Sequence, residues 1–395
     1  MQVNEKMLAL GSKRSIIREI FEYSKTRASE IGADKVFDFS LGNPSVEPPQ
    51  EITDTIKMLL DTEKATLLHG YTSAQGDFNV RKAVSNNINE KFNLSLTPNN
   101  IYMTCGAAAS LTISLKSVMN EGEECIVFAP FFTEYRVFVE NAGGKLVISN
   151  PDEKTFQIDI NDFESKINPN TRAVILNSPN NPSGVVYSAE IIKKVADILN
   201  NKSSEYGKTI YLIADEPYRE LVYGDIEVPY LMNYYKDTLV CYSYSKALSL
   251  PGERIGYIAV NPEMKNADKV YLSVCGAGRS LGYVCAPSLF QQVVGKCIDA
   301  KVDVSVYKEN RDILLKNLTE YGYDCVKPDG AFYLFVKSPD KDTYAFYERA
   351  KKYEILVVPC DDFGVNGYVR IAYCVDKSRV VNSLPAFKEL AESYK

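Results

Sequence analysis

A lysine, a carboxylate, a phenol and an amide each follow an apolar stretch of this sequence. Asn181 follows AVIL in the loop NSPNNPSG, Asp215 and Tyr218 follow IYLIA in DEPY, and Lys246 follows LVCYSYS. Ligands of open parallel sheets bind beyond the carboxyl ends of the strands. We therefore expect these four side chains to converge on one crevice, although each alone has an ordinary explanation as a helix cap or a solvated polar group.

The lysine and the aspartate together favour a ligand with a carbonyl and a ring cation. A half-buried Asp215 needs a cation or a strong donor to stay ionised. Lys246 could be that partner in a structural ion pair, but a lysine removed from water also has a lowered pKa and attacks carbonyls. Pyridoxal 5'-phosphate offers an aldehyde to a lysine and a protonated ring nitrogen to a carboxylate. Its ring oxygen can bind Tyr218 and Asn181.

The phosphate of that cofactor has candidate ligands in two stretches. TCGAAAS leads from a strand into a helix, so the amides of Gly106, Ala107 and Ala108 are expected to form a helix N-terminus that attracts anions. SYSKALSLPGERIGY supplies Ser243 and Arg254, and a guanidinium matches phosphate oxygens with two hydrogen bonds. The alternatives are a plain helix start and a surface arginine.

The elements that must position these groups alternate between strands and helices. ECIVFAP, KLVIS, RAVILNSP, TIYLIADEP, TLVCYSYSK and RIGYIAV read as strands, whereas GAAASLTISLKSVMN, FFTEYRVFVENAG and residues 189–206 read as helices. Continuous apolar strands between helices indicate an α/β fold with a mainly parallel sheet covered on both faces.

The pattern changes after about residue 290. A helical stretch over 288–321 precedes AFYLFVK, a helix near 342–353, EILVVP, GYVRIAY and a last helix from Lys377. We interpret residues 288–395 together with 1–46 as a smaller α+β domain, to which an amphipathic helix over 12–31 belongs. Residues 47–287 then form the large cofactor-binding domain.

Composition limits the partners and the compartment. A net charge of −6 and a pI near 5.3 disfavour nucleic acid and anionic membranes as partners. No apolar run approaches the roughly 18 residues that span a bilayer, and the N-terminus lacks the apolar core of a signal peptide. Nine cysteines without a Cys-x-x-Cys pair predict reduced thiols and a cytoplasmic location. The single histidine, His69, excludes a histidine-based zinc site, and we predict no metal.

Seven motifs, in order along most of the chain, resemble those of class I/II pyridoxal-phosphate aminotransferases. They are LGNP, GYTSAQG, NSPNNPSG, ADEPY, SYSKALSLPGERIG, PDGAFY and GYVRIAY. The resemblance implies the fold-type I arrangement, in which a large domain with a mixed, mainly parallel seven-stranded sheet covered by helices accompanies a smaller domain. It also implies a homodimer with both active sites at the subunit interface.

The resemblance assigns roles to the residues that match these motifs. Lys246 would bond to the cofactor aldehyde and then move the proton between the amino acid Cα and the cofactor C4′. Asp215 would keep the ring nitrogen protonated, Tyr218 and Asn181 would bind the ring oxygen, and Phe132 would stack on the ring.

Other matching residues would bind the substrate or the neighbouring subunit. Arg370 would hold the substrate α-carboxylate in a two-bond fork, helped by the Gly42 backbone, and Tyr71 would reach the phosphate of the neighbouring subunit's cofactor. Arg279, in GAGRSLGY, is a candidate second cation for a dicarboxylate side chain. The alternatives are ordinary packing for Tyr71 and Phe132 and a surface position for both arginines.

The implied function is amino transfer from an L-amino acid, aspartate or similar, to a 2-oxo acid such as 2-oxoglutarate. A β-lyase or another enzyme that breaks a Cα bond remains an alternative, as does a cofactor-binding regulator or inactive paralogue. A phosphate-binding ATPase is rejected because position 202, before Gly207-Lys208-Thr209, is lysine instead of glycine. A nicotinamide oxidoreductase is rejected because Gly282 stands one position late for Gly-x-Gly-x-x-Gly.

Overall fold

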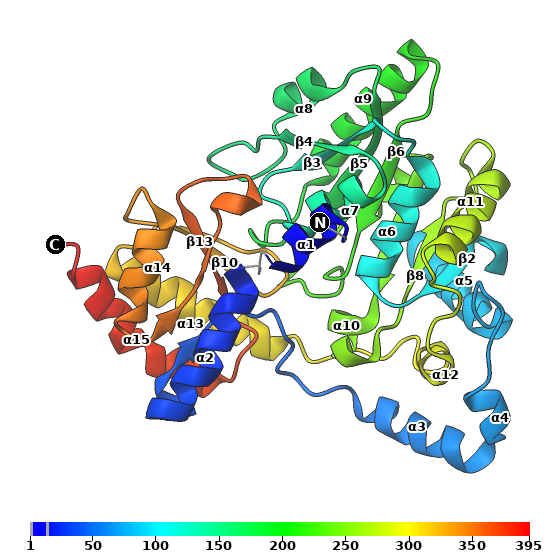
Figure 1. Cartoon of the computed structure of the whole chain (residues 1–395). Helices are drawn as coiled ribbons and strands as arrows, with labels where there is room; N and C mark the ends of the chain where they lie inside the picture. Colours follow the sequence, from blue (N-terminus) through cyan, green and yellow to red (C-terminus); the bar gives the residue numbers. More distant parts are fainter. Residues whose placement is uncertain (1–2, 13–15) are drawn as a thin grey trace.

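A computed structural model describes residues 3–12 and 16–395 of the chain (Figure 1). Its largest sheet has seven strands. Their order is β2 (Ile101–Thr104), β8 (Gly256–Val260), β7 (Thr238–Ser243), β6 (Tyr211–Asp215), β5 (Thr171–Asn177), β3 (Glu124–Phe128) and β4 (Lys145–Ser149). Only β8 runs against its neighbours β2 and β7, while the other pairs are parallel. The predicted α/β fold with a mixed, mainly parallel seven-stranded sheet is confirmed.

Helices cover this sheet, as the continuous apolar strands predicted. Every residue of β7 and β8 is buried, which requires cover on both faces. The helices of this part of the chain are α3 (Gln50–Thr62), α4 (Ala65–Leu68), α5 (Phe78–Phe92), α6 (Ala107–Val118), α7 (Glu134–Asn141), α8 (Ile160–Lys166), α9 (Ala189–Glu205), α10 (Tyr244–Ala247), α11 (Ala267–Ser280) and α12 (Ser288–Lys296).

A smaller α+β layer lies beside the main sheet (Figure 1). An antiparallel sheet has the order β12 (Val358–Pro359), β13 (Tyr368–Ala372), β10 (Tyr333–Lys337) and β9 (Cys325–Val326), and β1 (Phe37–Asp38) pairs in parallel with β11 (Ile355–Leu356). Its helices are α2 (Ile16–Ile31), α13 (Ser305–Tyr321), α14 (Thr343–Lys351) and α15 (Lys377–Glu392). The predicted domain boundaries at 46/47 and 287/288 stay a prediction.

The predicted continuous helical stretch over 288–321 is wrong. α12 ends at Lys296 and α13 begins at Ser305, so the chain between them is not helical. Asp303 lies just before this restart, and its carboxylate accepts a hydrogen bond from the Ser305 backbone N–H at 2.9 Å.

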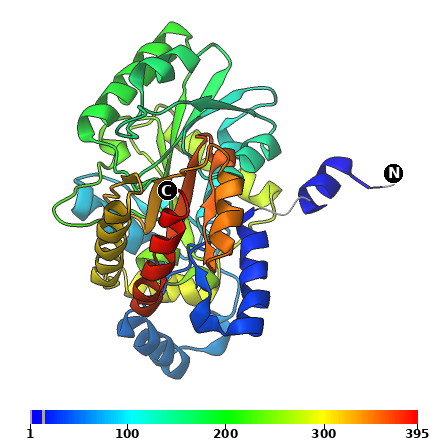
Figure 2. The same ribbon diagram turned by 90° about the vertical axis from the view of Figure 1, so that its left-hand side faces the viewer.

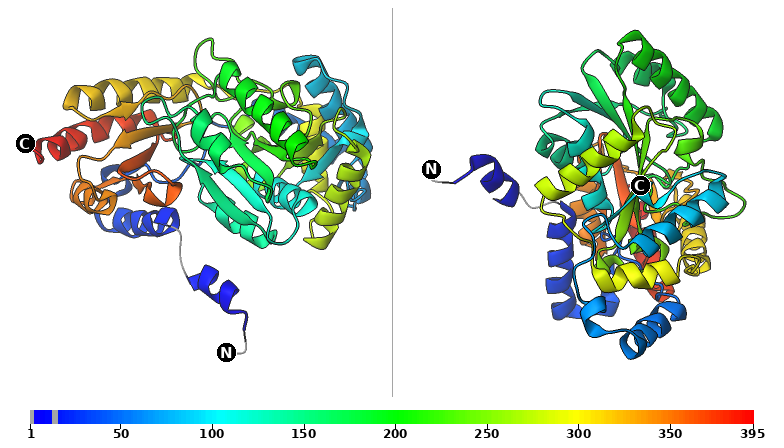
Figure 3. Two further views of the ribbon diagram at one scale, coloured as in Figure 1. Left: turned by 90° about the horizontal axis from the view of Figure 1, so that it is seen from above. Right: turned by 90° about the vertical axis from the view of Figure 1, so that its right-hand side faces the viewer.

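The N-terminal helix prediction needs a correction as well. The helix expected over 12–31 is α2, which starts at Ile16, and α1 (Glu5–Ser12) is a separate helix, while residues 13–15 lie outside the described residues. α1 has no buried residue and projects from the body of the molecule (Figures 2 and 3). Lys6 of α1 reaches Glu140 of α7 at 3.6 Å.

In the part of the chain that the structure describes, no helix combines the length and the apolar character that crossing a bilayer requires.

Candidate active site

A cavity of about 390 Å³ lies at the carboxyl ends of β5, β6 and β7. In the register of the sheet Asn177 is the partner of Asp215, and Asp215 is the partner of Cys241. These parallel strands therefore end at one edge, where their loops meet. The predicted site residues that line the cavity are Gly42, Ala107, Ala108, Phe132, Asn181, Asp215, Tyr218, Ser243, Lys246, Arg254 and Arg370.

Lys246 lies in α10, the short helix that directly follows β7. Ser243 caps this helix by accepting a hydrogen bond from the Ser245 backbone N–H at 3.1 Å. The Lys246 amine donates to the Gly42 carbonyl at 2.6 Å. Burial lowers the pKa of Lys246 to about 8, and the nearby Arg254 and Arg370 act in the same direction. A large share of these amines is therefore neutral near pH 8.

Asp215 ends β6 and is buried. The Tyr135 phenol donates a hydrogen bond to its Oδ2, whereas its Oδ1 has no hydrogen-bond partner among the described residues. Burial raises the pKa of Asp215 to about 7, and the bond from Tyr135 acts against that rise. Among the described residues Lys246 and Asp215 form no ion pair with each other, so the two charges remain available to a ligand.

Two asparagines and an arginine form a chain of hydrogen bonds beside the carboxylate. Asn177 donates from its side chain to the Asp215 carbonyl at 2.9 Å and accepts from the Asn181 backbone N–H at 2.8 Å. Arg370 donates to Asn181 Oδ1 at 3.1 Å and to the Ser40 carbonyl at 2.7 Å, and its Nε is buried without a partner. Asn177 was missed by the sequence reading, although it ends the strand AVILN.

A phenol pair closes another side of the cavity. The hydroxyls of Tyr218 and Tyr333 lie 2.9 Å apart, and the Arg370 guanidinium carbon lies 4.5 Å from the centre of the Tyr333 ring. A Cβ at Gly42 would come within 2.1 Å of the Tyr333 hydroxyl, so any other residue there would displace the Tyr333 ring. Tyr333 was not predicted as a site residue, although it ends the motif PDGAFY.

The groups of the predicted anion cradle lie together at the start of α6. Gly106 precedes this helix with a φ of 89°, and a Cβ there would meet Arg254 Nη2 at 2.8 Å. Arg254 lies 3.5 Å from Ser245 Oγ, which in turn accepts a hydrogen bond from Ser243 Oγ at 2.6 Å. A helix N-terminus, an arginine and two hydroxyls thus surround one space. Ser245 was missed, although it belongs to the quoted Ser-x-Ser-Lys motif.

The remaining predicted residues have different positions. Phe132 lines the cavity and meets the Tyr135 ring edge-on, with centroids 5.8 Å apart. Tyr71 does not line the cavity of its own chain, and its side chain is 99% exposed. Arg279 is exposed in the last turn of α11, and His69 is exposed at the end of α4. No cluster of three or more metal-ligating side chains occurs among the described residues.

These groups fit pyridoxal phosphate. Asp215 Oδ1 is a buried carboxylate oxygen that lacks a donor, and a protonated ring nitrogen provides one. The start of α6 with Arg254 suits a phosphate, and Lys246 has the lowered pKa that a carbonyl-binding amine requires. The three groups line or border a single cavity, so one molecule can bind all of them.

Comparison with known proteins gives an extensive match. The family model described as "Aminotransferase class I and II" matches residues 34–385. A probable aspartate aminotransferase of Methanocaldococcus jannaschii is 30% identical over 393 residues, which cover 96% of this chain and 98% of that protein. Aromatic-amino-acid aminotransferase 2 of Thermococcus litoralis is 26% identical, with 96% of each chain covered.

Solved structures agree with these relatives. The crystal structure of an aminotransferase from Eubacterium rectale superposes with a TM-score of 0.98 at 53% sequence identity and covers 100% of both chains.

Proposed function

The chain belongs to the aminotransferase class I and II family and is a pyridoxal-phosphate-dependent aminotransferase, and we propose that its donor is aspartate or a similar L-amino acid and its acceptor a 2-oxo acid such as 2-oxoglutarate. Relatives named for aspartate support this choice, while a relative named for aromatic amino acids keeps that class as a second candidate. The observation that carries the proposal is that Lys246 and the unpartnered Oδ1 of Asp215 border one cavity.

The cofactor, when bound, supplies an electron sink for the electron pair that remains after the Cα proton leaves. In our proposal the Lys246 amine accepts that proton and delivers it during transfer, because its pKa near 8 provides a neutral base. The Gly42 carbonyl, 2.6 Å from this amine, holds it on the substrate side of the cavity.

Asp215 is proposed to hold the protonated ring nitrogen, which keeps the sink effective. Tyr218 and Asn181 bind the ring oxygen, and Phe132 covers one face of the ring. The phosphate occupies the cradle of Gly106, Ala107, Ala108, Ser243 and Arg254, to which we add Ser245 because its hydroxyl lies within 3.5 Å of Arg254.

Arg370 is proposed to bind the substrate α-carboxylate. It is 2% exposed, and its unpartnered Nε leaves one donor for a carboxylate oxygen. The lining residues include three cations, Lys246, Arg254 and Arg370, all of which already have roles. A second carboxylate of aspartate therefore needs a cation from outside this cavity, and we propose Arg279 of the neighbouring subunit.

A homodimer and a cytoplasmic location form part of the proposal. The 99% exposure of Tyr71 supports a dimer, because a tyrosine that reaches a neighbouring active site must project from its own chain. All nine cysteines lie in the described part of the chain and are free thiols, which supports a reducing compartment.

Mixing the purified holoenzyme with an amino acid tests this function. An aminotransferase loses the yellow colour of the bound cofactor in one turnover, and a 2-oxo acid restores it. Half-reaction rates across a panel of amino acids then rank aspartate against aromatic donors. A protein that releases product while it stays yellow is a lyase, and a protein that shows neither change is a binding module, and either result overturns the proposal.

A further inference from the structure

The segment that carries Asp215 and Tyr218 directs its side chains to two different places. Asp215, Pro217 and Tyr218 line the active-site cavity. Arg219 and Glu220, from the same six residues, instead line a small separate cavity of about 30 Å³. The second cavity therefore adjoins the segment that positions the predicted cofactor ligands.

The lysine segment shows the same division. Ser243, Ser245 and Lys246 line the active-site cavity, but Tyr244, which lies between them in sequence, lines the small cavity. The two segments that we propose to bind the cofactor therefore also meet at the small cavity, where one contributes Glu220 and the other Tyr244.

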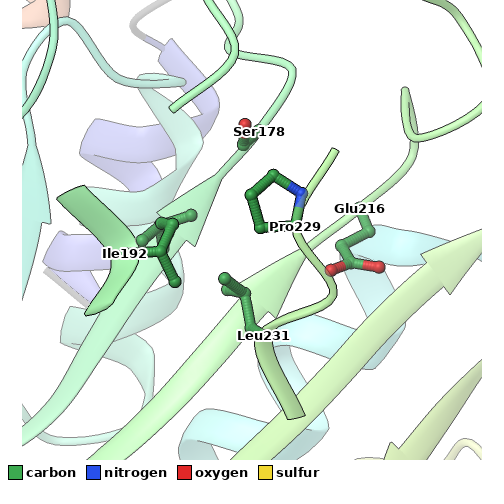
Figure 4. Close-up of a pocket in the computed structure, with 6 residues that line it drawn as sticks. Ser178, Ile192, Glu216, Pro229 and Leu231 are labelled. Carbon is green, nitrogen blue, oxygen red and sulfur yellow. The ribbon is translucent and has the colours of Figure 1, made fainter. Parts of the chain in front are cut away.

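Strong interactions hold Arg219, Phe92 and Tyr230, which line the small cavity, in place. Glu216 and Arg219 form a buried two-bond ion pair with distances of 2.5 and 2.6 Å. The Arg219 guanidinium lies 5.2 and 4.9 Å from the ring centres of Phe92 and Tyr230, which stack on each other at 3.9 Å. Figure 4 shows Glu216 beside Pro229 and Leu231. These side chains line a different hollow, which leaves no room for a water molecule.

The small cavity differs from this hollow, because it has room for a water molecule and is lined by polar atoms that lack hydrogen-bond partners in the described chain. A volume of about 30 Å³ exceeds the roughly 10–15 Å³ that one water requires. Three atoms that face the cavity are buried and have no hydrogen-bond partner in the part of the chain that the structure describes: Glu220 Oε2, the Tyr230 hydroxyl and the Tyr244 hydroxyl. Tyr230 and Tyr244 are each 4% exposed, so bulk solvent does not satisfy them.

We infer that this cavity is a binding site for one ordered water molecule, which bridges Glu220, Tyr230 and Tyr244. A water accepts two hydrogen bonds and donates two. Both phenols donate to its oxygen, and it donates to Glu220 Oε2. One molecule thereby satisfies all three atoms, which a native core rarely leaves unmatched.

The bridge links the two segments from behind the active site. Glu220 lies five residues after Asp215, and Tyr244 lies two before Lys246, so the water restrains the separation of the carboxylate and the amine. This consequence for catalysis rests on the proposed function, whereas the water site itself does not. Glu220 and Tyr244 are positioning residues, since neither lines the active-site cavity.

A crystal structure of the holoenzyme at a resolution that shows waters tests the site. We expect a single peak at about 2.7–3.0 Å from Glu220 Oε2 and both hydroxyls. Crystals soaked in rubidium chloride distinguish the rival occupant, a monovalent cation, because rubidium scatters anomalously. An anomalous peak in the cavity, or the absence of any ordered peak, overturns the inference.

A double-mutant cycle tests the link. Tyr244→Phe removes a donor to the water and Glu220→Met removes its acceptor, so in the double variant the folding constants from urea unfolding should differ from the product of the single effects by at least about three-fold. Tyr230→Phe replaces Tyr244→Phe if that variant does not fold. Tyr235→Phe is the matched control, because Tyr235 is 1% exposed but donates to the Ile210 carbonyl outside this cavity.

The same variants report on catalysis. We expect Tyr244→Phe to lower kcat several-fold while KM for the amino acid changes less than two-fold, and Tyr235→Phe to change neither. Independent effects in the unfolding cycle contradict the bridge. If the unfolding cycle shows coupling but Tyr244→Phe leaves kcat unchanged, the water does not restrain the separation of Asp215 and Lys246. Failure of the proposed transamination leaves the crystallographic and unfolding results unaffected, so the two failures are distinguishable.

Discussion

The Tyr135 phenol donates a hydrogen bond to one oxygen of the Asp215 carboxylate, and the other oxygen has no partner within residues 3–12 and 16–395. This arrangement fixes the orientation of the carboxylate before any ligand binds. It also opposes the rise of the Asp215 pKa that burial causes. Tyr135 therefore prepares Asp215 to receive a cationic donor.

Removing that hydroxyl should weaken the site without abolishing it. In Tyr135→Phe the pKa of Asp215 rises further, because the bond that lowers it is lost. We expect about a ten-fold weaker cofactor affinity, since one hydrogen bond to a charged group contributes about 1.5 kcal/mol. Equilibrium titration of the ligand-free protein with pyridoxal phosphate measures this. Tyr187→Phe is a control, because Tyr187 is equally buried and does not line the cavity. Equal affinities for both variants would argue against the role of Tyr135.

Asp215→Asn should bind the cofactor and yet turn over slowly. The amide has nearly the same shape but cannot hold a protonated ring nitrogen, so we expect kcat to fall at least about 100-fold, or roughly 2.7 kcal/mol in the barrier. Asp237→Asn is a matched control, because burial also raises the pKa of Asp237 and its Oδ1 also lacks a partner, but it does not line the cavity. Steady-state kinetics decide the matter, and a mild effect at Asp215 would contradict the electron-sink role.

The rate of cofactor capture should rise with pH between about 7 and 8. The pKa of Lys246 is lowered from 10.5 to about 8, so the reactive neutral amine forms above about pH 8. The pKa of Asp215 is raised from 3.8 to about 7, so the carboxylate ionises above about pH 7. Both required forms increase with pH, and the two effects reinforce each other.

Stopped-flow absorbance of the ligand-free protein mixed with pyridoxal phosphate follows this reaction. In Asp215→Asn only the rise near pH 8, which is due to Lys246, should remain. A profile that keeps rising toward pH 10.5 would mean that Lys246 is an ordinary solvated lysine.

Arg370→Lys should affect the substrate and spare the cofactor. Lysine keeps the charge but loses the planar fork that matches a carboxylate. We expect KM for the amino acid to rise about 10- to 100-fold, or roughly 1.4 to 2.8 kcal/mol, with an unchanged affinity for pyridoxal phosphate. Arg311→Lys is the control, because Arg311 is also buried but pairs with Asp312 away from the cavity. An unchanged KM in Arg370→Lys would move the carboxylate site elsewhere.

Polar residues that follow apolar strands were expected to converge on one crevice, and the structure brings them to one cavity, while their chemical roles stay a prediction. Asn181, Asp215 and Lys246 follow β5, β6 and β7, and the parallel register of those strands brings them to one edge. Such positions can be predicted from the sequence because the carboxyl ends of parallel strands lie at the same edge of an α/β sheet.

Contacts between segments that lie far apart in the sequence could not be predicted in this way. Tyr135 lies in a helix whose pattern carries no sign of Asp215, and the pairing of Tyr218 with Tyr333 joins the two layers of the molecule. The break between α12 and α13 was missed because apolar residues continue through it, while the turn at Asp303 depends on one local hydrogen bond.

The central claim is that Lys246 holds the cofactor aldehyde, and borohydride reduction of the purified holoenzyme tests it most directly. Reduction fixes the link as a stable secondary amine, and peptide mass spectrometry locates it. We predict one pyridoxyl-phosphate label on Lys246, and none in Lys246→Ala. Lys208→Ala, whose lysine also has a pKa lowered by burial but lies outside the cavity, should be labelled like the natural protein. A label on another lysine, or no label at all, would contradict the account.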